Sequence, residues 1–437
     1  MAVRNSLTAA TTVCLLGVTS GFTNLRLGSL QIEDFVLLLL LGFCIGKFIG
    51  SLFSLHISPE LNGLLKAYSL LLFALLAMAV LALRLRFYAL DEASLLKQPV
   101  IFSFSRLLQF VAIICGFLWL TNAFIKKRSL LFLALRAYWW TGIVCSWYAI
   151  VSYCAVAALH FSAPDIFGAY SNIDGGVRAR GLFNEGGPFG IYVVSIFVAG
   201  IVRRNTTGRT LGVVNIATLL TALLLSGSKA AFLVAACLAM FLIVSAASFR
   251  TRVYYLILAI AIGSGAWVWL DLGNQLGAYL YSYLNMGDEI AARGNDYNLV
   301  VGRLSALHIV PKMILAHPVT GIGLGNYPLM RNDPMYLDGL PAVTEIEDLP
   351  ALGIPGITAE MGVPITIWLV SLLLVPYLRN RREGPIFAMV ALFQPLAHTF
   401  GVQLNFFYPW FVTACVLGAA APRREWSVRT SYSAGDE

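Results

Sequence analysis

The sequence predicts an all-α, polytopic membrane protein with about 12 transmembrane helices and one long polar loop on the outer face, between helices 9 and 10. Of the 437 residues, 59% are hydrophobic and only 12% are charged, which is more apolar surface than a soluble core needs. Apolar runs of about 20 residues, enough to cross a hydrocarbon core, recur along the chain. Because these runs are continuous rather than alternating, they exclude a transmembrane β-barrel.

The apolar runs define the expected spans and divide the chain into parts. In order, the spans are expected at 7–23, 32–54, 63–84, 99–122, 132–158, 187–203, 210–227, 229–248, 252–270, 355–378, 384–402 and 405–421. The expected parts are helices 1–9 over 1–270, an outer loop subdomain over 271–354, helices 10–12 over 355–421, and a cytoplasmic tail over 422–437. The first apolar run has no obvious cleavage site after it, so it indicates a retained helix rather than a signal peptide.

Basic residues set the expected orientation, because cytoplasmic loops are enriched in Lys and Arg. With the N-terminus inside, five basic clusters face the cytoplasm: Lys126–Arg128, Arg203–Arg204 with Arg209, Arg250 with Arg252, Arg379 with Arg381–Arg382, and Arg423–Arg424. The segment from Arg84 to Lys97 is the exception, and Asp91 and Glu92 dilute its charge. The net charge of +8 is therefore explained by membrane topology rather than by nucleic-acid binding.

The seven cysteines all lie inside apolar runs, without the C-x-x-C or Cys/His spacing of a metal site. We interpret them as small core residues, so the sequence predicts neither a disulfide framework nor a metal centre.

Arg178 and Arg180 precede the sixth predicted helix on the outer face, where positive charge is disfavoured. Two guanidinium groups beside a helix N-terminus are typical of an anion site. The alternative is that both arginines snorkel to the membrane interface. We favour the anion site because of their outer position.

Lys229 begins the eighth predicted helix, after the turn Ser226-Gly227-Ser228. A cation at the start of a helix on the outer face opposes both the helix dipole and the positive-inside trend. An anionic ligand would offset that unfavourable charge. A snorkelling lysine explains the position equally well, so both interpretations stay open.

The outer loop contains Arg303 and, after it, the segment from His317-Pro318 through Gly321, Gly323 and Gly325-Asn326. Glycines in this spacing can cradle phosphate, but ordinary turns use the same residues. The segment has no Lys-Ser or Lys-Thr pair, so it does not support a nucleotide P-loop. The preceding stretch 304–315 predicts an amphipathic helix on the membrane surface.

Three carboxylates, Glu345, Glu347 and Asp348, precede the tenth predicted helix. One of them could act as a general base toward a sugar hydroxyl, although a solvated loop explains them as well. His398 lies in an apolar run near Gln394. A histidine within a membrane helix is a functional candidate, but we favour a packing role for it.

Four short motifs, in a fixed order, resemble the O-antigen ligase and polymerase family of bacterial surface-polysaccharide assembly. They are R-G-x-F from Arg180, S-x-S-R from Ser226 with Lys229 in place of the arginine, R…H-P-x-x-G-x-G-x-G-N from Arg303 to Asn326, and E-x-G from Glu360. The resemblance is best over 178–363. Ligases of the family usually carry a His-Asn pair eleven residues before the last glycine, but this chain has Ala351 and Leu352 there. That departure favours a polymerase over a ligase.

The resemblance implies a metal-independent, multi-pass glycosyltransferase of the bacterial inner membrane with its active site facing the periplasm and no cofactor. Its donor would be a glycan on undecaprenyl diphosphate, and its acceptor a lipid-linked repeat unit or, for a ligase, lipid A–core. Membrane lipids and a chain-length regulator protein are further expected partners. Arg178, Arg180, Lys229 and Arg303 would bind the substrate diphosphate, and the catalytic candidates are Glu345, Glu347, Asp348 and His317.

A secondary transporter or lipid flippase is a more distant alternative. Such proteins place charged residues near the midplane and build their helices from repeated halves, whereas this sequence gathers its charges at one face without an internal repeat.

Overall fold

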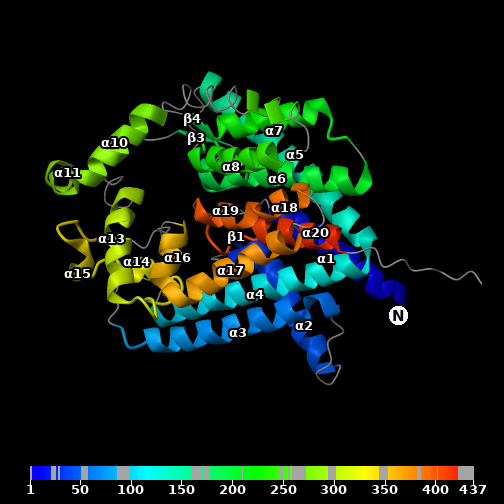
Figure 1. Cartoon of the computed structure of the whole chain (residues 1–437), viewed down its shortest axis with the longest axis horizontal. Coiled ribbons are helices and arrows are strands. Elements are labelled where there is room, and N and C mark those ends of the chain that lie inside the picture. Colours follow the sequence, from blue (N-terminus) through cyan, green and yellow to red (C-terminus); the bar gives the residue numbers. More distant parts are fainter. Residues whose placement is uncertain are drawn as a thin grey trace, which may run out of the picture.

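The computed structural model is a bundle of apolar helices with a group of shorter helices packed across one of its ends (Figure 1). It describes residues 2–20, 26–27, 30–50, 58–85, 99–159, 169–171, 177–208, 210–245, 250, 252–253, 256–257, 272–293, 302–343, 353–380, 385–400 and 402–421. Most of the predicted helix at 252–270 and the tail at 422–437 lie outside the described residues.

The first part of the bundle follows the predicted order of helices. It comprises α1 (Ala2–Thr19), α2 (Ile32–Gly50), α3 (Pro59–Ala82), α4 (Pro99–Lys126), α5 (Arg128–Leu159), α6 (Gly186–Thr207), α7 (Val213–Leu225) and α8 (Lys229–Ser245). Two short antiparallel hairpins join this set, β1 (Arg26–Leu27) with β2 (Leu30–Gln31) and β3 (Ala169–Ser171) with β4 (Val177–Ala179).

The C-terminal helices differ from the prediction because two of the expected spans are broken. The span expected at 355–378 is α16 (Gly353–Met361) and α17 (Val363–Asn380), separated by Gly362 in a left-handed conformation with φ 77°. The span expected at 384–402 is α18 (Pro385–Ala391) and α19 (Phe393–Thr399). Pro395 in the first turn of α19 has no N–H to bond back to Ala391, which explains the interruption. The last helix, α20 (Tyr408–Ala420), is buried nearly throughout.

Four of the described helices are long and apolar enough to cross a membrane: Leu61–Ala82, Ile101–Lys126, Arg128–Ala158 and Gly186–Thr207. Six shorter apolar helices of 10–17 residues accompany them. The chain is therefore an all-α, multi-pass membrane protein, and the count of twelve spans stays a prediction.

Side-chain contacts separate two ends of the bundle. At one end, Arg128 donates a hydrogen bond of 3.1 Å to the carbonyl oxygen of Ala421, which brings the start of α5 to the end of α20. At the other, the Tyr408 hydroxyl donates to the carbonyl oxygen of Pro188 at 3.3 Å, joining the starts of α20 and α6. We call the first the tail end and the second the loop end. The basic residues around Arg128 therefore lie at the tail end, opposite to the loop end.

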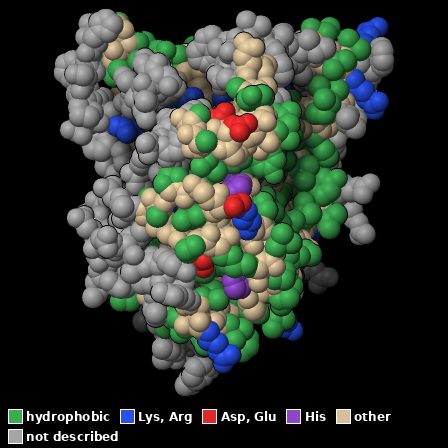
Figure 2. All heavy atoms as spheres, turned by 90° about the vertical axis from the view of Figure 1, so that its left-hand side faces the viewer, with side chains coloured by type: hydrophobic (Ala, Val, Ile, Leu, Met, Phe, Trp, Pro, Cys, Tyr) green, Lys and Arg blue, Asp and Glu red, His purple; other side chains and the backbone are tan. Residues whose placement is uncertain are grey.

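The polar segment forms its own small helical unit at the loop end. Its helices are α10 (Leu272–Leu284), α11 (Met286–Arg293), α13 (Arg303–Ala316), α14 (Tyr327–Met330) and α15 (Pro334–Leu337). They enclose a second hydrophobic cluster, apart from that of the bundle, built on α13 with Tyr336, Leu340 and Ala359. Figure 1 places these helices on the left, and Figure 2 shows acidic, basic and histidine side chains gathered on that face. The helix predicted at 304–315 is confirmed as α13.

Candidate functional site

Arg178 reaches the turn between α7 and α8 from the β3–β4 hairpin. In β4 it pairs with Tyr170, and its neighbour Ala179 is fully buried. A Cβ on Gly227 would lie 3.3 Å from Arg178 Nε, and Gly227 has a left-handed φ of 57°. Glycine is therefore needed here for its backbone conformation, which few other residues adopt, and it leaves room for the guanidinium group.

Ser228 fixes the first residue of α8 in place. Its hydroxyl accepts from the Ala231 backbone N–H at 3.2 Å, which is an N-cap bond, and donates to the Gly187 carbonyl oxygen at 3.1 Å. A Cβ on Gly186 would lie 2.6 Å from the carbonyl oxygen of Ser226, so the turn packs against the start of α6 without space for a side chain. The starts of α6 and α8 are thus held together, and Lys229 is the first residue of α8.

Two arginines from separate parts of the chain act on Lys229 at this turn. Burial makes the charge of the Lys229 ammonium less favourable, and the charges of Arg178 in β4 and Arg303 at the start of α13 add to this effect. We call these three residues the cationic cluster. Lys229 and Arg303 also oppose the dipoles of the helices they begin. An anion would be favoured at such helix N-termini, and the diphosphate-binding role of the three residues stays a prediction.

Arg180 occupies a neighbouring turn rather than the cluster around Lys229. Its Nη1 donates to the Asn184 carbonyl oxygen at 3.4 Å, and its own carbonyl oxygen accepts from the Phe183 backbone N–H at 2.9 Å. Gly181 has a left-handed φ of 55°, and a Cβ there would meet the Phe189 ring. The R-G-x-F motif therefore forms a tight turn in front of α6, and the diphosphate-binding role of Arg180 stays a prediction.

His317 ends the helix that Arg303 begins. The two residues are fourteen positions apart, about 20 Å along a helix axis. His317 Nε2 lies 3.1 Å from the Tyr336 hydroxyl, inside the loop unit. The structure does not bring His317 to the cationic cluster, so its catalytic role stays a prediction.

The glycine loop after His317 packs on the break between α16 and α17. The Ile322 and Gly323 N–H groups donate to the carbonyl oxygens of Ala359 and Glu360, both at 2.9 Å. The Glu360 carboxylate in turn accepts from the backbone N–H groups of Gly325 and Tyr327. A protein carboxylate therefore takes the place in this loop that a phosphate would need, which corrects the phosphate-cradle interpretation.

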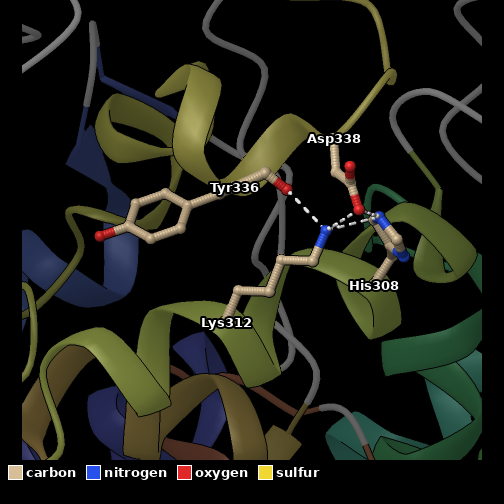
Figure 3. Close-up of polar contacts among 4 residues, drawn as sticks. All are labelled: His308, Lys312, Tyr336 and Asp338. Carbon is tan, nitrogen blue, oxygen red and sulfur yellow. Dashed lines mark hydrogen bonds and ion pairs between the residues drawn. The ribbon is translucent and has the colours of Figure 1, made fainter.

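A second polar cluster lies on the surface of the loop unit, between α13 and the turn after α15 (Figure 3). Lys312 Nζ lies 2.9 Å from Asp338 Oδ2 and 2.8 Å from His308 Nε2, and it donates to the Tyr336 carbonyl oxygen at 3.4 Å. Burial and the nearby Lys312 ammonium lower the pKa of His308, against the opposing effect of Asp338. The hydrogen bond from Lys312 lowers the pKa of Asp338. A neutral His308 can accept from Lys312, so the cluster is arranged for neutral pH.

The three candidate bases Glu345, Glu347 and Asp348 lie outside the described residues. His398 is fully buried, and its Nδ1 bonds the Val402 carbonyl oxygen at 3.0 Å beside the Trp410 ring. This position supports the packing interpretation of His398.

A family model described as O-antigen ligase matches residues 214–348 of the chain. The matched segment contains two of the three cations of the cluster, Lys229 and Arg303, together with the glycine loop. No curated protein matches the chain. The matched segment, together with the residues at the loop end, supports the resemblance of this multi-pass membrane protein to the O-antigen ligase/polymerase family.

Proposed function

We propose that the protein is a membrane glycosyltransferase that polymerises oligosaccharide repeat units carried on undecaprenyl diphosphate, at the periplasmic face of the bacterial inner membrane. One observation carries the proposal: at one end of an apolar bundle, the charges of Arg178 in a hairpin and Arg303 at a helix start both act on Lys229 at another helix start. Positive charge at the end of membrane helices suits a ligand with an anionic head and a lipid tail.

In the proposed reaction, a hydroxyl of the acceptor sugar attacks the anomeric carbon of the donor glycan. The bond from that carbon to the diphosphate oxygen breaks, and undecaprenyl diphosphate leaves with the electron pair. The cationic cluster stabilises the negative charge that grows on the departing diphosphate. Glu345, Glu347 and Asp348 stay the candidates to take the hydroxyl proton.

The cluster also explains why the proposal needs no metal ion. In many phosphoryl and glycosyl transfers a divalent cation neutralises a diphosphate, whereas here two guanidinium groups and an ammonium would supply that charge. The lipid tails would lie along the bundle, and the polar glycan against the helices of the loop unit. A chain-length regulator protein is a further proposed partner.

A ligase that transfers the finished glycan to lipid A–core is the second candidate, favoured by the description of the matching family model. The polymerase is favoured by Ala351 and Leu352, which stand where ligases of the family usually carry His-Asn. The two functions use the same donor and differ in the acceptor.

The test is a reaction of the purified full-length protein with synthetic lipid-linked repeat units, in chelator and without nucleotide, resolved on a gel. The proposal predicts a ladder of lengthened lipid-linked glycans. Transfer only after addition of lipid A–core would replace the polymerase by the ligase. If neither product forms from a donor of the correct sugar composition, the glycosyltransferase proposal fails and a transporter or flippase becomes the better account.

Variants of the cationic cluster connect the activity to the site. Arg178→Gln and Arg303→Gln remove charge while keeping a polar side chain, and removing a group that stabilises transition-state charge typically lowers the rate by about 10²- to 10³-fold. Arg204→Gln is the matched control because Arg204 is exposed near the C-terminal end of α6, away from the cluster. Full activity of both cluster variants would contradict the proposed role of the site.

A further inference from the structure

Glu360 lies at the junction of the two hydrophobic cores. Its neighbour Ala359 belongs to the core of the loop unit, whereas Met361 belongs to the core of the bundle. The side chain is largely shielded from solvent. Its carboxylate accepts from the Tyr327 backbone N–H at 3.4 Å and from the Gly325 N–H, and Arg106 on α4 acts on its charge.

The backbone on both sides of Glu360 is paired with the glycine loop. Before it, the Ala359 carbonyl oxygen accepts from Ile322 at 2.9 Å, and after it, the Val363 N–H donates to the Pro318 carbonyl oxygen at 2.8 Å. Gly362 comes so close to this loop that a Cβ would lie 2.2 Å from the Val319 carbonyl oxygen. The Glu360 side chain therefore closes a contact that the main chain begins.

This contact determines how α13 is attached. The glycine loop follows α13 directly, and α13 begins with Arg303 of the cationic cluster. α13, which contains Pro311, joins Arg303 to this loop, so the position of the loop constrains the position of Arg303. The loop also contacts the bundle through Gly325, where a Cβ would lie 2.6 Å from Arg106 Cγ.

We propose that Glu360 is a positioning residue: its carboxylate holds the glycine loop to the break between α16 and α17, and so sets where α13 presents Arg303. This inference rests on the proposed function of the cationic cluster. It adds to that function a residue that lies outside the cluster and outside the segment matched by the family model.

Burial raises the pKa of Glu360 to about 7, against the opposing effects of the Gly325 and Tyr327 N–H groups and of Arg106. Tyr327 on α14 also faces it and is hydrogen-bonded to Arg331. The other titratable or charged groups on the helices that pack on α16 are Arg303, His308 and Lys312 on α13, Tyr377 and Arg379 on α17 and His398 on α19. We call the contact of the Glu360 carboxyl with the Gly325 and Tyr327 N–H groups the latch. Because the closed latch raises the pKa of Glu360, opening it to water releases a proton, so the latch loosens as the pH rises through 7.

The stability of the folded protein changes in the same direction. Because the pKa of Glu360 is raised from 4.5, the folded state keeps a proton that the unfolded state has lost between about pH 4.5 and 7. The Glu360 contribution to stability therefore falls as the pH rises through that window. A transfer rate that changes around pH 7 in fully folded protein separates the positioning role from a purely structural one.

Glu360→Gln tests the inference in the full-length protein, because it keeps an acceptor oxygen of the same size but never ionises. At pH 6, where both side chains are largely uncharged, the two rates should be similar. At pH 8, one unit above the pKa of Glu360, the wild-type rate should be lower than that of Glu360→Gln by up to about tenfold, so the fall around pH 7 disappears in the variant. Glu289→Gln is the control, since Glu289 bonds Ser282 elsewhere in the polar segment, and it should keep the wild-type pH profile.

Hydrogen exchange gives a readout that does not depend on the proposed activity. In the wild type, after correction for intrinsic rates, amides of 318–330 should become less protected as the pH rises through 7, relative to α3. In Glu360→Gln that change should be absent. If transfer fails in every protein but exchange behaves as expected, the proposed function is wrong and the latch stands. A wild-type pH profile and wild-type exchange in Glu360→Gln would overturn the latch. Should that variant not fold, pH-independent exchange of 318–330 in the wild type would overturn it equally.

Discussion

Lys229 is the residue whose charge the proposed diphosphate site depends on most directly. It starts α8 beside two arginines, where its charge opposes both the helix dipole and its neighbours. In the sequence, the position of a cation at an outer helix start already suggested an anion site. The structure adds that the charges of Arg178 and Arg303 act on Lys229.

Lys229→Arg should keep transfer activity, because arginine is the usual residue of the family at this position and a guanidinium group binds diphosphate well. Lys229→Gln should lower the rate by about 10²-fold. The measurement is the initial rate of glycan extension by equal amounts of folded protein. Equal rates for Lys229→Gln and the wild type would show that the charge is not used.

Glu360 is the residue whose role the sequence analysis missed. The E-x-G motif was visible, but the partners of the glutamate are backbone N–H groups more than thirty positions earlier in the chain. Every residue except proline has a backbone N–H group, so residue identity does not reveal which of these groups bond the glutamate. The glycine spacing from Gly321 to Gly325 was the only signal, and it suited a phosphate as well as a carboxylate.

At the scale of elements, hydrophobic runs predicted the helices well and their interruptions poorly. The expected span at 355–378 contains the sequence Gly362-Val363-Pro364, and a proline is well tolerated in the first turn of a helix. Gly362 and Pro364 were therefore the available signal for a new helix start at Val363. The break itself depends on the glycine loop, which only the fold brings beside Gly362.

Gly362→Ala should detach the glycine loop from the helix break. The new Cβ would lie 2.2 Å from the Val319 carbonyl oxygen, and the left-handed φ of 77° adds strain of about 1–2 kcal/mol. We expect faster hydrogen exchange over 318–330 and a lower melting temperature. Gly63→Ala is the matched control, since a Cβ there meets nothing within 4 Å; equal behaviour of the two variants would contradict this view of the break.

The loop unit should lose stability in mild acid through His308. Because the folded protein lowers the pKa of His308 below its usual 6.5, the unfolded chain takes up the proton first as the pH falls below about 6.5. Protonation also removes the acceptor that Lys312 uses in Figure 3. After correction for intrinsic exchange rates, the amides of α13 and α15 should therefore become less protected in the wild type as the pH falls from 7 to 5.

His308→Gln should weaken that acid dependence, since glutamine presents an acceptor without titrating. His317→Gln serves for comparison, because His317 bonds Tyr336 rather than a charged group. The same loss of protection in His308→Gln as in the wild type would assign the acid sensitivity to another residue.

At the scale of the whole molecule, the sequence predicted two ends of different character, and contacts of Arg128 and Tyr408 distinguish two ends of the bundle. Charge counting placed the basic clusters together, and one member of them, Arg128, bonds Ala421 at the tail end. The same counting placed Arg178 and Lys229 with the polar segment, and the charges of Arg178 and Arg303 both act on Lys229. What the sequence could not supply was the length of each helix, because several buried helices are shorter than a full span.

The loop end should face away from the cytoplasm. In a cysteine-free background, Met335→Cys, on the exposed surface of α15, should react with a membrane-impermeant maleimide on intact spheroplasts. Asn205→Cys, exposed at the tail end of α6, should react only after the membrane is opened. The reverse pattern would invert the orientation and remove the periplasmic site from the account.

The central claim is that Arg178, Lys229 and Arg303 form one site for a lipid diphosphate. Binding of a fluorescent short-chain prenyl diphosphate to the purified protein tests it most directly, with the prenyl monophosphate for comparison. The account predicts tighter binding of the diphosphate, weakened at least about tenfold by Arg178→Gln, Lys229→Gln and Arg303→Gln, and unchanged by Arg204→Gln. Wild-type affinity in all three folded cluster variants would contradict it.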